Sequence, residues 1–319
     1  MDCPERVSEM VGIREIARLE EKFVSGHRLC AGCGAGTMAR LVLRAVENKC
    51  IVTNATGCLE VASTIYPYTS WKVPWLHTAF ENAGANASGI EAALKAMMRK
   101  GKIPKEQIDV IAFGGDGGTF DIGIQALSGA LERGHDFLYI CYDNNAYMNT
   151  GIQRSGATMY GAWTTTSPAG THSIGKSEFP KDLVGIVAAH NIDYCATASI
   201  AYAGDLVDKV RKGLAVDGPA FMYVMAPCPR GWRHESDLAI SIARLAVQTR
   251  ITPVYEVVKG QYILNRKVPK PKPVEDYLKI QGRFRHLFRP ERNEETINAI
   301  QEYVDLRWER LLKLIEATA

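Results

Sequence analysis

The sequence has no apolar run that reaches the about 18 residues of a membrane-spanning helix, and its first residues, MDCPER, are too polar for a secretion signal. The net charge is only +3, and the Lys and Arg residues are not gathered into one block. The charge therefore gives no reason to expect nucleic acid as a partner. We expect a cytoplasmic protein that binds neither membranes nor nucleic acid.

The eight cysteines lack the patterns that would explain them most simply. Without a secretion signal a disulfide framework is not expected, and the second C-x-x-C of a zinc ribbon is absent. Cys30 and Cys33 form a C-x-x-C motif, Cys58 follows after the 24 residues 34–57, and Cys228 lies far downstream. A redox dithiol would use only two thiols. The spacing favours four thiolates on an iron–sulfur cluster, while a zinc site and reduced structural cysteines remain open.

The sequence does contain a strand–helix–strand unit whose two strands end in polar clusters. Residues 110–118 read VIAFGGDGG, and residues 138–151 read LYICYDNNAYMNTG. Between them, residues 121–133 have apolar side chains at helical spacing and end at Gly134. Open α/β sheets bind ligands at the carboxyl ends of parallel strands. We therefore expect the two polar clusters to lie side by side.

The chemistry of these clusters favours a diphosphate that is bridged by a metal ion. Glycines let the backbone approach a phosphate closely, and Asp116 and Asn144 offer the hard oxygen atoms that a Mg²⁺-like cation prefers. A glycine turn followed by an Asx turn is the alternative for the glycine cluster taken alone. The pair is more specific, because the 26 residues 118–143 separate GDG from NN. This spacing resembles the fingerprint of enzymes that use thiamine diphosphate.

The remaining pattern predicts an α/β domain with a tail of different character. The 319 residues are 46% apolar, enough for a substantial core. We expect an N-terminal arm at 1–25 with a short helix around 13–23, an α/β domain at 26–250, and a C-terminal extension at 251–319. The expected strands are 50–53, 194–197 and 220–226, and the expected helices are 37–47, 183–190 and 204–214. In the extension we expect a hairpin at 254–264 and an amphipathic helix at 292–317.

Several segments have no clear periodic pattern. Residues 66–77 predict an ordered loop, with His77 and Glu81 as a polar pair near a helix start. Residues 151–181 are too long for an ordinary connection, and we expect them to cover an active site or a subunit contact. The basic and aromatic residues 283–288 suit either a docking surface or arginines lying over the domain's own core. Cys3 is predicted to be a free surface thiol.

Six motifs together resemble the β subunit of the 2-oxoacid:ferredoxin oxidoreductases, and the pyruvate:ferredoxin oxidoreductases are the nearest branch. They are CAGCG, NATGCLE, WKVPWLHTAFENA, GGDGGTFDIG, DNNAYMNTGIQRS and APCPRGW, within residues 26–288. The resemblance implies a mostly parallel, doubly wound α/β sheet of the thiamine-diphosphate-binding (diphosphate module) type with a C-terminal helical extension. It also implies thiamine diphosphate, Mg²⁺ and a [4Fe–4S] cluster as cofactors.

The resemblance assigns a role to each matching position. The [4Fe–4S] ligands would be Cys30, Cys33, Cys58 and Cys228, and the Mg²⁺ ligands would be Asp116, Asn144 and the Ala146 carbonyl. The catalytic residue would be Asn149, which would face the substrate. The residues around thiamine diphosphate would be Ala35, Cys58, Gly115, Asp116, Gly117, Gly118, Asn144, Asn145, Ala146, Tyr147, Met148 and Asn149.

The resemblance also implies partners. Thiamine activation needs a carboxylate from a second α/β module, and this chain has a single GDG…NN unit. In the family an α subunit carries that carboxylate, and γ and ferredoxin-like δ subunits complete a hetero-oligomer. The substrates would be CoA, ferredoxin and a 2-oxoacid: pyruvate, or alternatively 2-oxoisovalerate, 2-oxoglutarate or oxalate. A non-catalytic zinc- or nucleotide-binding scaffold subunit is the alternative from another functional class.

Overall fold

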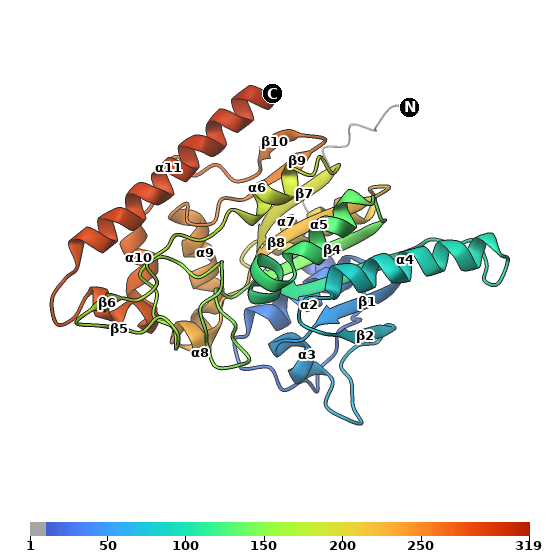
Figure 1. Cartoon of the computed structure of the whole chain (residues 1–319), viewed down its shortest axis with the longest axis horizontal. Helices are drawn as coiled ribbons and strands as arrows, with labels where there is room; N and C mark the ends of the chain where they lie inside the picture. The colour runs from blue at the N-terminus through green and yellow to red at the C-terminus, as the bar shows by residue number, and fades with distance from the viewer. Residues whose placement is uncertain (1–10) are drawn as a thin grey trace.

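The computed structural model describes residues 11–319, which form one eight-stranded sheet with helices on both faces and a separate two-stranded ribbon (Figure 1). The predicted thiol of Cys3 lies outside the described residues. The sheet order is β10-β9-β7-β8-β4-β3-β1-β2. Its strands are β1 (Lys49–Ala55), β2 (Trp75–Thr78), β3 (Ile108–Gly115), β4 (Phe137–Asp143), β7 (Tyr194–Ser199), β8 (Pro219–Met225), β9 (Tyr255–Val258) and β10 (Gln261–Leu264), and the ribbon is β5 (Ala169–Gly170) with β6 (Ser173–Ile174).

The sheet is parallel except at one edge. Every pairing among β1, β2, β3, β4, β7 and β8 is parallel, whereas β9 runs antiparallel to β7 and β10 runs antiparallel to β9. Parallel strands covered on both faces are apolar throughout, and all seven residues of β4 are buried. The predicted fold class is therefore confirmed.

Alternate residues of each strand enter two different cores. Ile111 and Phe113 of β3 pack in one apolar cluster with α2 (Gly34–Ala45) and α7 (Ala203–Leu214). Val110 and Ala112 pack in the other, with α4 (Ala83–Arg99), α5 (Ile124–Glu132) and α6 (Leu183–Ala188). This alternation follows from the two-residue period of a strand.

The C-terminal extension forms a third core beside the sheet. This third core contains side chains from α9 (Ala239–Gln248), α10 (Val274–Lys279), the 3-10 helix η3 (Gly282–Leu287) and α11 (Glu294–Thr318). α11, red in Figure 1, runs along one flank, and the expected helix at 292–317 is confirmed. Arg283 and Phe284 are buried in this core. The docking-surface interpretation of residues 283–288 is therefore wrong for these two, and the alternative, packing over the domain's own core, is correct.

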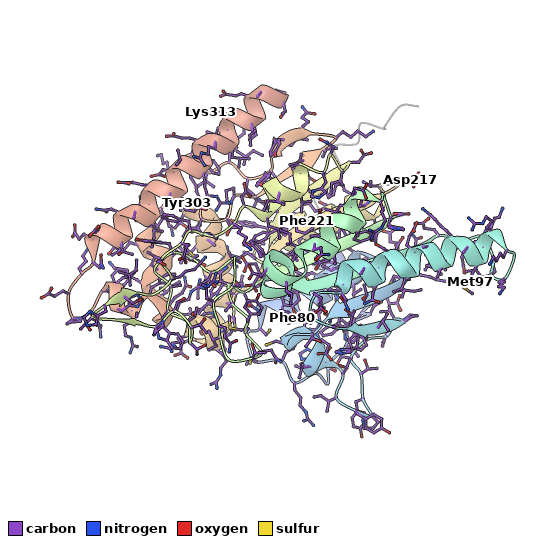
Figure 2. All side chains as sticks on the ribbon, in the orientation of Figure 1. Phe80, Met97, Asp217, Phe221, Tyr303 and Lys313 are labelled. Carbon is purple, nitrogen blue, oxygen red and sulfur yellow. The ribbon has the colours of Figure 1, made fainter. Side chains whose placement is uncertain are left out.

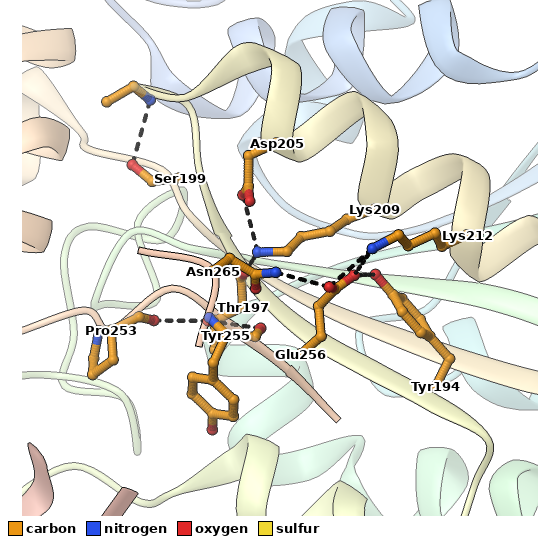
Figure 3. A network of polar contacts seen from close by, with 11 residues as sticks. Tyr194, Thr197, Ser199, Asp205, Lys209, Lys212, Pro253, Tyr255, Glu256 and Asn265 are labelled. Atoms are coloured by element: carbon orange, nitrogen blue, oxygen red, sulfur yellow. Dashed lines mark hydrogen bonds and ion pairs between the residues drawn. The ribbon is translucent and has the colours of Figure 1, made fainter. Parts of the chain in front are cut away.

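A buried polar network fastens the antiparallel edge to the parallel sheet (Figure 3). The Glu256 carboxylate of β9 accepts hydrogen bonds from Tyr194 Oη at 2.7 Å, Lys212 Nζ at 2.9 Å and Asn265 Nδ2 at 2.8 Å. Burial by itself would raise the pKa of Glu256, but these three donors bring it below its ordinary value. The same network ties α7 to β9 through Lys212.

The structure differs from the sequence predictions in the N-terminal third. The short helix predicted around 13–23 is confined to α1 (Ile13–Ile16), and Phe23 forms a bridge to Trp71 in the core. The loop predicted at 66–77 contains the edge strand β2. His77 pairs with Glu60 at 2.9 Å, so the predicted pairing with Glu81 is wrong.

The predicted division into domains stays a prediction. β9 and β10 continue the sheet across the boundary placed at residue 250. Within residues 11–319, none of the helices combines the length and apolar character needed to cross a membrane.

Candidate functional site

The predicted ligand residues follow the carboxyl ends of neighbouring parallel strands. Asp116 comes directly after β3 and Asn144 directly after β4. Cys58 lies three residues beyond β1, at the start of α3 (Cys58–Ser63), and Cys228 lies three residues beyond β8. A pocket of about 420 Å³ opens at this edge. Its wall is formed by Thr56, Gly57, Cys58, Phe80, Gly115, Asp116, Gly117, Tyr142, Asn144, Ala146, Tyr147, Met148, Asn149 and Thr150.

The glycine cluster is a helical turn rather than the loop that its composition suggests. Asp116 already has helical backbone angles and leads into the π-helical turn η1 (Gly117–Ile122). A Cβ on Gly117 would come within 2.7 Å of the Tyr147 ring, and one on Gly118 within 2.8 Å of the Phe80 carbonyl oxygen. Phe80 is labelled in Figure 2. Its ring stacks on the ring of Tyr147, with the two ring centres 5.4 Å apart. Close packing of the pocket wall therefore requires these glycines, independently of any ligand.

Three oxygen-bearing groups converge at the base of the pocket. One terminal atom of the Asn144 amide lies 2.9 Å from the carbonyl oxygen of Ala146 and 3.1 Å from Oδ1 of Asp116. If this atom is the amide nitrogen, it donates to both oxygens. If it is the amide oxygen, three acceptors face one another, and a cation is needed to hold them together. Octahedral Mg²⁺ with its ligands at about 2.0–2.1 Å would separate adjacent oxygens by about 3 Å, so the geometry fits this ion.

A second buried carboxylate, Asp143, lies within electrostatic range of Asp116. Burial and the neighbouring Asp143 raise the pKa of Asp116 well above its ordinary value. Ser155 Oγ donates to Asp116 Oδ2 at 2.5 Å. Burial also raises the pKa of Asp143, although hydrogen bonds from Tyr223 and Asn145 oppose this. A bound cation would offset the negative charge of the two carboxylates. The Asn144 amide is neutral and would not.

Three predicted cofactor-binding residues lie outside the pocket wall. The side chain of Asn145 turns away and donates to both carboxylate oxygens of Asp143 at 2.9 Å, and its φ is +61°. Ala35 is buried in α2, and Gly118 packs against Phe80. Asn149 lies in the wall and is exposed, so that it can meet a substrate. The roles of all these residues stay predictions.

Other residues that shape the site could not be found from sequence patterns. Besides Ser155, the indole Nε1 of Trp232 donates to the Asn144 carbonyl at 2.6 Å, and Thr158 Oγ1 donates to the Asn145 carbonyl at 2.7 Å. Ser155 and Thr158 belong to the long segment 151–181, which was expected to cover the site. In the structure Ser155 and Thr158 contact Asp116 and the backbone of Asn145, and neither residue lines the pocket. No local motif indicates such contacts between distant parts of the chain.

The four predicted cluster thiols come within electrostatic range of one another. Burial, then Cys228, Cys33 and Cys30, raise the pKa of Cys58 to about 12. Burial and the same neighbours raise the pKa of Cys228 to about 11, although the Gly231 N–H donates to its sulfur at 3.4 Å. All described cysteines are free thiols.

The spacing of these thiols bears on the kind of metal they can hold. Within residues 11–319, no three Cys, His, Asp or Glu side chains are placed to hold one metal ion. The zinc site and the iron–sulfur cluster both stay predictions. One zinc ion gathers all its ligands around itself. A [4Fe–4S] cluster binds each thiolate through a different iron, which accommodates more widely spaced sulfurs.

Sequence comparisons place the chain among thiamine-dependent enzymes. The family described as "Thiamine pyrophosphate enzyme, C-terminal TPP binding domain" matches residues 55–224. The chain is 57% identical over 287 residues to the pyruvate synthase subunit PorB of Methanocaldococcus jannaschii, covering 90% of this chain and 95% of that protein. It is 51% identical over 316 residues to PorB of Thermotoga maritima, covering 97% and 98%. It is also 48% identical over 318 residues to the ketoisovalerate oxidoreductase subunit VorB of Pyrococcus furiosus, covering 99% of both.

Among solved structures, the chain resembles a 2-oxoglutarate:ferredoxin oxidoreductase from Magnetococcus marinus with 2-oxoglutarate, coenzyme A and succinyl-CoA bound. The TM-score is 0.54 at 21% identity, and the match covers 70% of this chain and 79% of that chain. At this identity the likeness concerns the fold alone. It agrees with the parallel, doubly wound sheet described above.

Proposed function

The chain belongs to the β subunits of the 2-oxoacid:ferredoxin oxidoreductases, the family of the pyruvate synthase subunits PorB, and we propose that it binds thiamine diphosphate, Mg²⁺ and a [4Fe–4S] cluster. The reaction is the reversible oxidative decarboxylation of pyruvate with CoA to acetyl-CoA and CO₂, with two electrons passed singly to ferredoxin. The observation that carries the proposal is the convergence of the Asn144 amide on the Asp116 carboxylate and the Ala146 carbonyl, at a pocket whose wall includes one of four neighbouring thiols.

The residues of this chain would hold and orient the cofactor. Asp116, Asn144 and the Ala146 carbonyl would bind Mg²⁺, which would offset the negative charge of the diphosphate. Ser155 orients the Asp116 carboxylate, and the Trp232 indole fixes the backbone that carries Asn144. Bound thiamine diphosphate would supply the nucleophilic carbon and the electron sink for decarboxylation.

The part of the pocket near Asn149 and Thr150 would receive the substrate. The Tyr147 ring, stacked on Phe80, forms an apolar wall that excludes water from one side. Tyr147 Oη donates to Asp121 at 3.1 Å, which fixes the ring in place. Asn149 and Thr150 are exposed at the rim, where the amide of Asn149 could donate a hydrogen bond to the keto acid.

Cys30, Cys33, Cys58 and Cys228 would bind the cluster close to the same pocket. Cys58 belongs both to the thiol group and to the pocket wall, so it brings an electron acceptor next to the cofactor site. An adjacent one-electron acceptor is what distinguishes oxidation to ferredoxin from non-oxidative thiamine chemistry. The remaining subunits, including the α subunit with the pyrimidine-side carboxylate, would complete the enzyme.

The test is performed on the complex assembled under anaerobic conditions. We expect a brown protein whose dye reduction depends on both a 2-oxoacid and CoA, with the highest kcat/KM for pyruvate. The 48% identity to VorB over nearly the whole chain supports 2-oxoisovalerate as the second candidate, so the panel includes 2-oxoisovalerate, 2-oxoglutarate and oxalate. A colourless, inactive complex that contains zinc would instead support a scaffold subunit. A higher kcat/KM for 2-oxoisovalerate would change the assigned substrate and leave the reaction class intact.

A further inference from the structure

A short turn at residues 155–158 contacts both of the segments that carry the proposed metal ligands. Ser155 Oγ donates to Asp116 Oδ2 at 2.5 Å, in the segment that follows β3. Thr158 Oγ1 donates to the Asn145 carbonyl at 2.7 Å, in the segment that follows β4. The two residues are also joined to each other, because the Ser155 backbone N–H donates to Thr158 Oγ1 at 2.9 Å. The turn therefore bridges the segments that follow β3 and β4.

Lys176 is attached to the end of this turn by a buried hydrogen bond. Only 2% of its surface is exposed, and its Nζ donates to the Thr158 carbonyl at 2.7 Å. Within residues 11–319, this carbonyl is the one hydrogen-bond acceptor of the Lys176 side chain. The backbone of Lys176 is fixed as well, since its carbonyl accepts from the Gly161 N–H at 2.8 Å and its N–H donates to the Ala162 carbonyl at 3.0 Å.

Burial makes the bond between Lys176 and Thr158 difficult to replace. Burial and Arg154 lower the pKa of Lys176 to about 8, although Glu178 and Asp121 oppose this, so the side chain is still an ammonium at pH 7. A charged donor forms hydrogen bonds about twice as strong as those of a neutral one. An ammonium buried without an acceptor is unfavourable, and the position of the Thr158 carbonyl is therefore tied to that of Nζ.

We propose that Lys176 is a positioning residue for the Mg²⁺ site, an inference that rests on the proposed function. Lys176 fixes Thr158, Thr158 and Ser155 belong to one turn, and Ser155 orients the Asp116 carboxylate. Without the ammonium, the turn would lose the contact at its end, and Ser155 would hold the carboxylate less firmly. Groups that hydrogen-bond to a metal ligand change metal affinity by about 10- to 100-fold. Lys176 acts through such a group, so we expect the lower end of that range.

The experiment measures thiamine diphosphate binding to the assembled complex by isothermal titration calorimetry at a series of Mg²⁺ concentrations. At limiting Mg²⁺ we expect Lys176→Met to raise the Kd of thiamine diphosphate by about tenfold. Excess Mg²⁺ should restore the wild-type affinity, because the defect lies in metal binding. A general packing defect would not be corrected by Mg²⁺. Lys270→Met, the same change at an exposed lysine, is the matched control.

A double-mutant cycle tests whether Lys176 acts through Ser155. Ser155→Ala should weaken binding at limiting Mg²⁺ at least as much as Lys176→Met does. Adding Lys176→Met to Ser155→Ala should then change the Kd by less than about twofold, because the contact to Asp116 is already lost. If the two single effects multiply in full, Lys176 does not act through Ser155 and the proposal is overturned.

Two further results would overturn the proposal. One is wild-type affinity of Lys176→Met at every Mg²⁺ concentration, and the other is a loss of affinity that excess Mg²⁺ does not restore. The melting temperature of each complex shows whether the fold is retained. If Lys176→Met does not assemble, Lys176→Gln takes its place with the same expected shift, since it removes the charge and keeps a polar side chain. A wild-type complex that binds thiamine diphosphate equally well with and without Mg²⁺ would instead refute the proposed function.

Discussion

The individual site residues depend on partners that lie far away in the sequence. Ser155, 39 residues from Asp116, fixes the carboxylate that would bind the metal. Trp232, 88 residues from Asn144, holds the backbone of the second proposed metal ligand. The ligands follow the strand ends because the parallel sheet brings those ends together, but their orientation is fixed by these distant groups. Substituting a proposed ligand and substituting the residue that supports it should therefore change cofactor affinity by different amounts.

Asp116→Ala should weaken the binding of thiamine diphosphate in excess Mg²⁺ by at least about a hundredfold. Even the loss of a group that only hydrogen-bonds to a metal ligand lowers metal affinity by about 10- to 100-fold. The fold should be retained, since the substitution removes one of two buried carboxylates that repel each other. Isothermal titration calorimetry of the assembled complex measures the affinity. Asp237→Ala, the same change at an exposed carboxylate outside the pocket, is the control. Wild-type affinity in Asp116→Ala would show that the metal assignment is wrong.

Cys58→Ser should remove or severely destabilise the cluster and stop ferredoxin reduction, because a hard alkoxide replaces a soft thiolate poorly on iron. Iron analysis of the assembled complex should show the loss of about four iron atoms relative to the wild type. Cys195→Ala, at a buried cysteine of β7 away from the pocket, should keep its iron. The prediction fails if the serine variant retains full iron and normal activity.

The elements were predictable where one physical pattern dominates. β3 and β4 are buried on both faces, so their apolar runs identify them, and the apolar stripe of α11 identifies the terminal helix. The edge strand β2 is short and partly exposed, so its sequence resembles a loop. η1 was not predicted because glycine composition favours a turn, whereas packing against Tyr147 and Phe80 selects a π-helical turn.

The candidate site, like the secondary structure, could be predicted only where local sequence patterns decide it. The motif residues Asp116 and Asn144 could be identified because their types and spacing are local properties of the sequence. The orientation of Asn145 could not, since it depends on the burial of Asp143 and on the left-handed backbone at that position. Arg283 was ambiguous for a related reason. A basic residue among aromatics suits both a surface and a core, and only the packed structure decides between them.

At the antiparallel edge, Glu256→Gln should lower the melting temperature of the assembled complex near neutral pH. Burial alone would raise the pKa of Glu256, but its hydrogen-bond donors hold it below the ordinary value, so folding stabilises the ionised carboxylate. This stabilisation is present above the unfolded pKa of about 4.3 and is lost as the pH falls through the folded pKa. The difference between variant and wild type should therefore shrink below about pH 4.3. We expect the free energy of unfolding to fall by about 1.5–3 kcal/mol at neutral pH, as for hydrogen bonds to a charged group.

The control for this prediction is Glu309→Gln, the same change at an exposed residue of α11. Thermal unfolding followed by circular dichroism at a series of pH values measures the difference. An equal difference at pH 7 and at low pH would mean that the ionisation of Glu256 does not contribute to stability.

We propose that the molecule as a whole presents half of a thiamine site. The proposed metal ligands and the glycine turn follow the carboxyl ends of neighbouring parallel strands. The exposed residues Asn149 and Thr150 lie in the wall of the pocket at this end of the sheet. Tyr66 and Tyr68, on the loop between α3 and β2, are 94% and 77% exposed.

The isolated chain should therefore be inactive and should gain pyruvate-dependent dye reduction only when a subunit with the pyrimidine-side carboxylate is added. A single module encloses the diphosphate end of the cofactor, and the aminopyrimidine end needs a carboxylate that the family carries on its α subunit. The tail residues 283 and 284 give no support to this prediction, because they are buried in this chain's own core. Light scattering gives the mass of the purified chain, and the dye assay is then run with and without the partner. Turnover by the isolated chain would refute the half-site interpretation, whereas activity that rises with added partner and saturates at a fixed stoichiometry would establish it.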